Sequence, residues 1–415
     1  MHLRILIVFA LSLFLLGCNG ENHTINDGYA EDNNVYQINT GEDYINSVPE
    51  QQTQPYRQEE NFPEQRRGWE ILTEKERKML SECNDVLFSF SPVPIDSITN
   101  IEPIGEANPP EHTLASISSD TYIAVEETTT LVAPGDIWII LIQPRYGVTQ
   151  DPEDHVIKYA MCKDIYGVVD HVKGFSPEMQ QIVDNFECPD QNTEPGDDRC
   201  PILSMVPVKA GTPLGKVGGM QGNFNFGTWD LRVNHAYISP KRHGQLSLHS
   251  TCPFDYYGSP LKEQLMGKIK RQDEGRCGTV LHDIPGTLQG DWFIGDATIM
   301  RPSDWGKLLF LGHDNDFPEQ LLIVASGIFV ERPTKWFITP EKSGMKNRDF
   351  GEVKDYEIYC YDNEGDEEYR NYEKGKTEGR ILIQLSSKNE LKIEHQNDLC
   401  KAGNWQFKSP VTYIR

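Results

Sequence analysis

The sequence predicts a mainly β protein with few short helices. Runs of β-branched and aromatic residues recur between turn signals, as in Tyr122–Val125 and Ile137–Ile142. The stretch after Leu288 contains almost only strand and turn signals, which favours an antiparallel β-rich, barrel-like C-terminal domain. Apolar spacing typical of helices is confined to short segments. We therefore expect sheets to form the core and helices to lie at its periphery.

Length and charge limit the classes of function. The chain has 415 residues, which is room for two or three domains with full-sized cores. Asp and Glu outnumber Lys and Arg by 63 to 39, and the resulting net charge of -24 would repel a phosphate backbone. With 38% hydrophobic residues, the composition is typical of a soluble globular protein. Nucleic acid is therefore not expected as a partner. The composition also excludes the class of polytopic membrane proteins for this chain.

The first residues predict export. Arg4 precedes the apolar run Ile5–Leu16, which is too short to span a membrane but suits the core of an export signal. Leu15-Leu16-Gly17-Cys18 resembles the lipobox of bacterial lipoproteins. This resemblance implies that residues 1–17 are a lipoprotein signal peptide and that Cys18 is acylated, with an ordinary secretory signal as the alternative. Several acyl chains would hold the protein stably on a membrane.

This membrane is expected to be part of a bacterial cell envelope. Asn19 is not the aspartate that often retains lipoproteins in the inner membrane, so the outer membrane, or a periplasm-facing position, is favoured. Residues 18–68 are rich in Asn, Gln, Glu and Asp without apolar periodicity, and we interpret them as a disordered acidic linker. Ordered structure is predicted to begin near Trp69, where Thr73 and Glu76 form a capping box ahead of a short helix.

Two domains are predicted beyond the linker, at 69–280 and 281–415. In the first, Ser176 caps a helix with Pro177 at its first position, and Ser259 and Pro260 are expected to play the same roles in a second helix. In the second, Ile381–Leu385 and Leu391–Glu394 are predicted to form a hairpin.

The cysteines agree with export. Setting Cys18 aside leaves eight of the nine, an even number that suits an oxidising compartment. The disulfide candidates are Cys83, Cys162, Cys188, Cys200, Cys252, Cys277, Cys360 and Cys400. No spacing typical of a zinc ribbon or a thioredoxin occurs among them. Order and proximity favour Cys360 with Cys400 and Cys188 with Cys200, although sequence alone leaves the connectivity open.

Segments between about Asn108 and Tyr257 contain strand and turn patterns with regularly placed glycines. Leu131-Val132-Ala133-Pro134-Gly135-Asp136 and the segment Val208–Gly219 resemble, in the right order, the strand-and-turn motifs of LytM-type or lysostaphin-like zinc endopeptidases. The resemblance covers about a third of the chain and implies the duplicated hybrid motif, a β fold, for the first domain. The glycines of these motifs serve tight turns and carry no catalysis.

The same resemblance implies where a zinc site would lie. Active members hold zinc with an early His and Asp and with the second His of a late H-x-H motif. His112 and Asp120 stand at the early positions, eight residues apart where the family has four. The late position holds either Asn223-Phe224-Asn225 or Thr228-Trp229-Asp230, and His171 resembles a mid-domain His of the family. The degenerate groove would thus contain His112, Asp120, His171, Asn223, Asn225 and Asp230.

These substitutions argue against hydrolysis. A hydrolytic zinc ion needs three protein ligands and an open position, and the asparagine carbonyl oxygen binds zinc poorly and cannot abstract a proton near neutral pH. We therefore expect no catalytic residue, metal or cofactor. The sequence predicts a membrane-anchored lipoprotein with a non-catalytic, peptidase-like domain that binds peptidoglycan or an envelope protein. The alternative is a zinc-dependent cell-wall endopeptidase with an altered metal site.

Three other patterns have simpler interpretations. His235, His243 and His249 match no chelating spacing and are expected at the surface. His313–Asp316 lacks the pattern of a calcium loop and is expected to form a polar turn. Gly290-Asp291-Trp292 resembles the first-strand signature of lipocalins, in which case Arg415 could stack on Trp292, but packing of Trp292 in a core is the default interpretation. A small-molecule carrier of that kind would need a deep apolar cavity.

Overall fold

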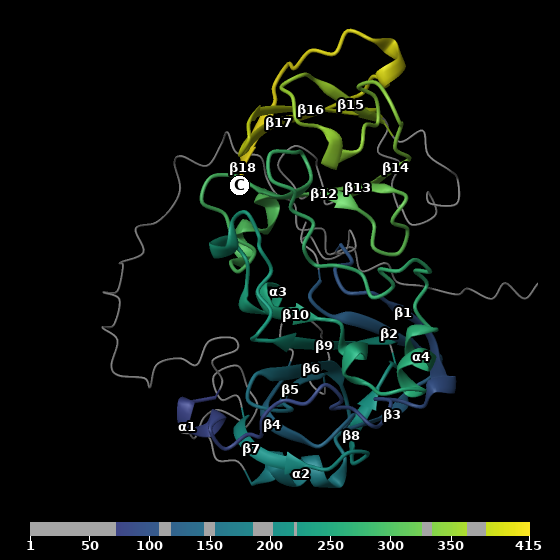
Figure 1. Ribbon diagram of the computed structural model, residues 1–415, viewed down its shortest axis with the longest axis vertical. Coiled ribbons are helices and arrows are strands. Elements are labelled where there is room, and N and C mark those ends of the chain that lie inside the picture. Colours follow the sequence, from purple (N-terminus) through teal and green to yellow (C-terminus); the bar gives the residue numbers. More distant parts are fainter. Residues whose placement is uncertain are drawn as a thin grey trace, which may run out of the picture. The chain divides into compact units, whose positions relative to one another are not determined.

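The computed structural model describes residues 72–107, 118–144, 154–185, 202–219, 222–325, 334–362 and 379–415. These residues form a mainly β structure with short helices, which confirms the predicted fold class (Figure 1). The α-helices are α1 Glu74–Arg77, α2 Pro177–Asp184, α3 Gln245–His249 and α4 Leu261–Met266. Cys18, the predicted linker and His112 lie outside the described residues.

The strands of the described chain fall into two large sheets and a small one. The first large sheet contains β1 Ile98–Glu102, β2 Thr121–Val125, β4 Ile137–Pro144, β5 His155–Ala160, β6 Ile165–Val172, β7 Ile202–Val208, β9 Asn223–Asp230 and β10 Ser250–Thr251. The small sheet pairs β3 Thr129–Val132 with β8 Pro213–Val217. The second large sheet contains β11 Gly290–Phe293, β12 Leu308–His313, β13 Leu321–Ala325, β14 Thr334–Ile338, β15 Tyr359–Asp362, β16 Arg380–Ser387, β17 Glu390–Gln396 and β18 Val411–Ile414.

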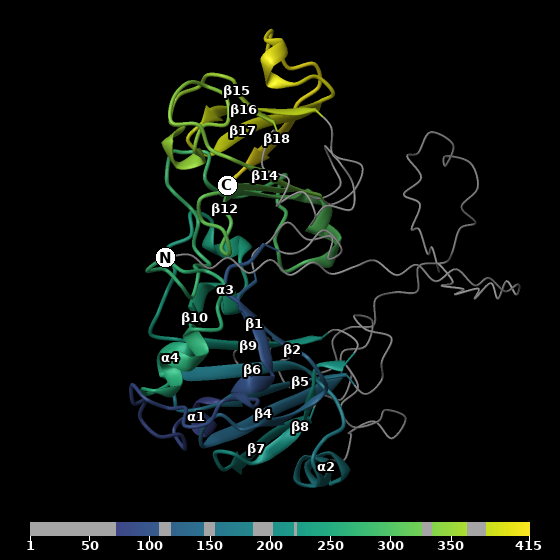
Figure 2. The same ribbon diagram turned by 90° about the vertical axis from the view of Figure 1, so that its right-hand side faces the viewer.

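In the first sheet β9 lies between β2 and β6, in the order β1-β2-β9-β6-β5-β4-β7 (Figure 2). All of these strands pair antiparallel, so their side chains alternate between the two faces. Phe224 and Phe226 of β9 are fully buried in the core on one face, where Phe226 packs 5.8 Å from Phe88. On the other face Trp229 stacks on Tyr166, 5.9 Å between ring centroids.

Local signals place the helix starts. Thr73 and Glu76 form the predicted capping box, and the Ser176 hydroxyl accepts a hydrogen bond from the backbone N–H of Met179, as predicted. The prediction for Ser259 was wrong by one residue. Pro260 is the N-cap residue, and α4 begins at Leu261, because the Ser259 hydroxyl donates to the Glu263 carboxylate and does not cap a backbone N–H.

The second sheet is an antiparallel meander whose first and last strands also pair. Its order is β14-β13-β12-β11-β18-β17-β16-β15, which gives the predicted barrel-like form. β16 and β17 form the predicted hairpin, with Ile383 opposite Ile393. Trp292 is fully buried, and the guanidinium of Arg415 lies 4.1 Å from the centre of its ring, as the lipocalin-like signature predicted. Apolar side chains from all eight strands converge in one core cluster.

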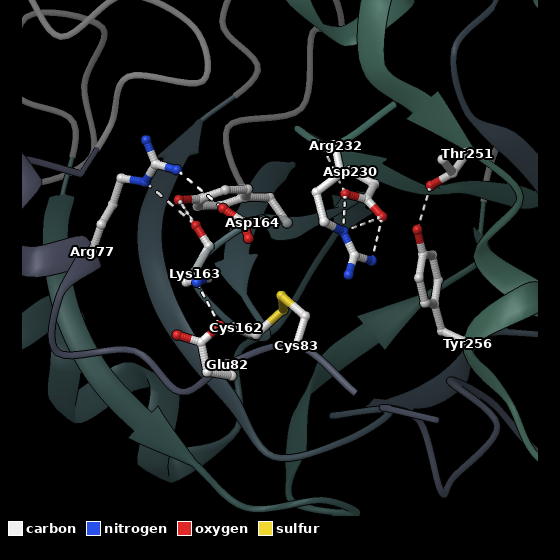
Figure 3. Close-up of a disulfide and its surroundings, with 11 residues drawn as sticks. Arg77, Glu82, Cys83, Cys162, Lys163, Asp164, Asp230, Arg232, Thr251 and Tyr256 are labelled. Carbon is white, nitrogen blue, oxygen red and sulfur yellow. Dashed lines mark hydrogen bonds and ion pairs between the residues drawn. A yellow bond between two sulfur atoms is a disulfide. The ribbon is translucent and has the colours of Figure 1, made fainter. Parts of the chain in front are cut away.

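Disulfides join segments that are distant in the sequence. Cys83–Cys162, Cys252–Cys277 and Cys360–Cys400 are bonded, and the last of these is a predicted pair. Cys188 and Cys200 lie outside the described residues. Figure 3 shows Cys83–Cys162 flanked by ion pairs from Lys163 to Glu82 and from Arg77 to Asp164. These bonds fit a protein that folds outside the cytoplasm.

One surface prediction was wrong. His243 is buried, with 4% of its surface exposed, because its ring stacks on Tyr237 at 3.9 Å. Burial lowers the pKa of His243 to about 4, so this imidazole is neutral near neutral pH. His235 and His249 contact the backbone carbonyls of Ser250 and Val233, respectively. Among the described residues, no helix is both long and apolar enough to cross a membrane.

Candidate functional site

The middle of the first sheet carries polar side chains in strand interiors. Asn223 and Asn225 of β9 alternate with the buried Phe224 and Phe226, so both asparagines lie on the face opposite the aromatic core. Tyr122 of β2 is directly opposite Asn225 in the strand register, and therefore shares its face. Trp229 lies on the same face at the far end of β9. This face is thus apolar at one end of the strand and polar at the other.

The carboxylate of Asp120 lies against β9. A Cβ added to Gly227 would lie 2.1 Å from Oδ1 of Asp120, so glycine is required here for the carboxylate to approach the strand. Gly227 and Asn225 are two residues apart and share a face. Asp120 therefore lies beside the asparagines, where the family resemblance had placed a metal ligand.

A lysine faces the same region from β5. Lys158 is opposite Val168 of β6, and Val168 is opposite Gly227, which puts the three residues on one face. Burial lowers the pKa of Lys158, and the negative charges of Asp120 and Asp170 offset part of this effect. The ammonium group of Lys158 is therefore close enough to both carboxylates to interact with them.

Two further side chains on this face, Tyr122 and Asn225, are half-buried. Burial raises the pKa of Tyr122 to about 12, so the phenol is a neutral hydrogen-bonding group near neutral pH. The amide oxygen of Asn225 is buried and has no hydrogen-bond partner among the described residues. We call Asp120, Tyr122, Lys158, Asp170 and Asn225 the polar face.

At one end of the polar face, His171 forms a buried cluster with two aspartates. Nδ1 of His171 lies 2.9 Å from Oδ2 of Asp154, and the backbone N–H of His171 donates to Oδ1 of Asp170 at 2.9 Å. The three residues are 7%, 1% and 6% exposed, respectively. One potential ligand atom from each residue lies within 4.8 Å of the others.

Some of the predicted site residues lie on one face of the first sheet, and one lies on the opposite face. Asp120, Asn223 and Asn225 share one face, and His171 lies near Asp170 at the end of the neighbouring strand. Asp230 is five residues beyond Asn225 and so lies on the opposite face. Its carboxylate binds Arg232 at 2.6 Å, as Figure 3 shows. Asp230 is thus paired within the protein and does not belong to the polar face.

Sequence reasoning missed Tyr122, Lys158, Asp154 and Asp170. Lys158 interrupts the otherwise apolar run Val156–Ala160 of β5, and this was a usable signal. The sequence offered no signal for joining Asp154 to His171, because their proximity depends on how β5 and β6 pair. The described part of β9 carries no imidazole, and its polar groups can donate and accept hydrogen bonds and attract charge.

Comparisons with known proteins are weak. No model of a protein family and no curated protein matches this chain. A hexagonal crystal structure of Helicobacter pylori Csd3 is 13% identical, with a TM-score of 0.26, over 42% of this chain and 34% of that one. Its orthorhombic crystal structure is 12% identical, with a TM-score of 0.25, over 44% of this chain and 40% of that one.

The pore-forming complex of SpoIIQ and SpoIIIAH supplies a third similar chain. It is 10% identical, with a TM-score of 0.26, over 43% of this chain and 96% of that one. The matched region spans less than half the length of Csd3 in either crystal form. Similarities at this level assign neither the fold family nor the function of this chain.

Proposed function

We propose that this chain is an exported lipoprotein whose peptidase-like domain, residues 69–280, binds a component of the bacterial cell envelope without hydrolysing it. The component is peptidoglycan or a partner protein, and a lipid on Cys18 provides the anchor. The lipobox-like and LytM-like motifs support this proposal, and the disulfides fit the oxidising compartment that it requires.

The observation that carries the proposal is the pair of asparagines on β9. Asn223 and Asn225 stand at one of the two positions where the family resemblance expects the H-x-H motif, in the middle of the sheet and on the same side of it as the polar face. Amide groups can hydrogen-bond a ligand but cannot serve as a general base. Lys158 also places a positive charge beside Asp120, which opposes a cation at that carboxylate.

The polar face has suitable chemistry for a peptide-containing ligand. Lys158 can attract a carboxylate, Asp120 and Asp170 can attract an amine, and Tyr122 and Asn225 can hydrogen-bond amides or hydroxyls. Peptidoglycan carries carboxylates, amines and amides in its stem peptides and hydroxyls in its sugars. The buried amide oxygen of Asn225 would gain a hydrogen bond from such a ligand, and this gain favours binding.

Isothermal titration with soluble muropeptides tests the proposal. We expect saturable binding by the wild-type protein and a loss of about tenfold or more in Asn225→Ala, since a buried hydrogen bond in a ligand site is worth roughly 1–2 kcal/mol. Asn234→Ala is a matched control, because Asn234 is exposed just beyond β9. Equal affinities of wild type and Asn225→Ala would exclude the polar face as the binding site. Absence of heat with wild type would remove peptidoglycan as the ligand.

The competing interpretation is a zinc-dependent endopeptidase with an altered site. It predicts that purified protein supplied with zinc releases peptide ends from cross-linked wall material. The non-catalytic proposal predicts binding of the same material without such release.

A further inference from the structure

Asp154, Asp170 and His171 form a buried cluster of side chains that could ligate a metal ion, and none of the three lies on β9. The set combines one imidazole with two carboxylates, all at least nine-tenths buried. We propose that it binds one divalent transition-metal ion, with zinc as the first ion to test. This inference does not rest on the proposed function, because uptake of an ion is measured without any envelope component, although Asp170 belongs to both groups of residues.

A β-bulge explains how adjacent residues reach the same point. His155 pairs with Val172 and Ile157 pairs with Val169, so two steps on β5 face three steps on β6. The bulge on β6 therefore comprises Asp170 and His171, and the backbone of His171 has a φ of 62°. Side chains of consecutive strand residues normally point to opposite faces, whereas a bulge re-aims one of them. The bulge thereby brings both side chains to the cluster with Asp154.

The spacing of the donor atoms fits a small cation. Zinc binds imidazole nitrogen and carboxylate oxygen at about 2.0–2.2 Å, which puts neighbouring ligand atoms roughly 3–3.5 Å apart. Nδ1 of His171 and Oδ2 of Asp154 are 2.9 Å apart, and one potential ligand atom from each of the three residues lies within 4.8 Å of the other two. Small side-chain rotations would therefore close the set around an ion.

A fourth potential ligand, the amide oxygen of Asn225, lies on the neighbouring strand β9. Val169 of β6 pairs with Phe226 of β9, and the next residues, Asp170 on β6 and Asn225 on β9, adjoin this last pair. The amide oxygen of Asn225 is buried and has no hydrogen-bond partner in the described part of the chain. An ion at Asp170, or a water molecule on that ion, would supply the missing partner.

The donor set selects a class of ion. Imidazole with carboxylates suits zinc and other first-row divalent metals, whereas calcium takes six to eight oxygen ligands. The ammonium of Lys158 interacts with Asp170 and lowers the affinity for any cation. Removing this charge should therefore tighten binding, an effect that mere damage to the fold would not produce.

Isothermal titration of tag-free, EDTA-treated full-length protein tests the inference. We expect uptake of one zinc ion per chain, no competition by excess calcium, and affinity weakened by at least about tenfold in Asp170→Asn and His171→Gln. Asp296→Asn is the matched control, because the Asp296 side chain is 90% exposed. Lys158→Met should bind zinc more tightly than wild type.

Two results would overturn the inference. One is the absence of saturable zinc uptake by wild type, and the other is undiminished uptake by both Asp170→Asn and His171→Gln. X-ray absorption of the wild-type zinc complex provides a readout that needs no variant to fold. A shell of one imidazole with oxygen ligands is expected, and a shell with several imidazoles or with sulfur would place the ion elsewhere.

Discussion

The two large sheets differ in how the polar side chains within their strands are satisfied. In the second sheet, β13 is buried at all five positions, and buried polar side chains of β16 and β17 bond to one another, as Arg380 does to Gln396 and Gln396 does to Glu394. The first sheet buries Phe224 and Phe226 on one face but carries Lys158, Tyr122 and Asn225 in strand interiors on the other. Polar groups in such positions cost stability unless they are satisfied. The contrast indicates that the second sheet is mainly scaffold and that the first bears the site.

The largest effect is expected from the core of the second sheet. Trp292→Ala removes a fully buried ring, its hydrogen bond to the Leu288 carbonyl at 2.8 Å and its contact with Arg415. We expect the free energy of unfolding to fall by about 3–5 kcal/mol, as measured by urea denaturation. Trp405→Ala, at a partly exposed tryptophan, should cost less. Equal losses for the two variants would contradict the scaffold role of this core.

Removal of a disulfide should come next. Cys360 and Cys400 are 40 residues apart, and their bond restricts the unfolded chain. The double variant Cys360→Ala/Cys400→Ala should lose about 2–4 kcal/mol of unfolding free energy. The double variant should keep the wild-type affinity for muropeptides. A loss of affinity as large as that of Asn225→Ala would contradict the assignment of the second sheet to scaffold and of the first sheet to the binding site.

The free energy of unfolding should depend on pH through two acidic residues, Glu106 after β1 and Asp316 after β12. Burial, with the charge of Asp314, raises the pKa of Glu106 to about 8 and that of Asp316 to about 7. Lys335 contacts Glu106 at 3.1 Å and lowers the Glu106 pKa only in part. The folded state therefore keeps protons that the unfolded state releases near pH 4–4.5.

The sign of this linkage is fixed by the raised pKa values. The contribution of Glu106 and Asp316 to the free energy of unfolding is fully present below the pKa that these carboxyls have in the unfolded chain. This contribution is lost as the pH rises through their folded-state pKa values of about 8 and about 7. The urea midpoint of wild type should thus fall between pH 5 and pH 8, and Glu106→Gln should flatten this fall. Glu357→Gln, at an exposed position, should leave the wild-type fall unchanged. A midpoint that fell equally in Glu106→Gln would show that Glu106 is not the titrating group.

The smallest effect on stability is expected on the polar face. Asn225→Ala removes a buried amide oxygen that lacks a partner among the described residues, so its unfolding free energy should change by less than about 1 kcal/mol. The measurement is the same urea titration. A loss comparable to that of Trp292→Ala would show that the asparagine supports the fold and would weaken its assignment to a site.

The sequence predicted what depends on neighbouring residues. The capping box at Thr73, the cap at Ser176 and the hairpin at Ile381–Leu385 are local, and each is present. The burial of His243 was missed because its stacking partner is set by the fold. The cluster of His171 with Asp154 was missed for the same reason, since it requires a bulge in the pairing of β5 with β6.

The candidate site was therefore predicted only in part. A motif resemblance pointed to Asp120, Asn223 and Asn225, and the structure places these three together. Asp230 lies on the other face, because alternation along a strand separates residues that differ by five positions. Sequence distance alone gave no means of choosing between the two registers considered for β9.

The most direct test of the central claim is an assay of wall hydrolysis. Cross-linked peptidoglycan is incubated with pure wild-type protein and excess zinc, and newly released amino groups and soluble fragments are quantified. Because β9 offers asparagines where a hydrolytic zinc ion would need imidazoles, we predict binding of the material with no release above the level of heat-denatured protein. Release that increases with time and stops on addition of EDTA would contradict the account.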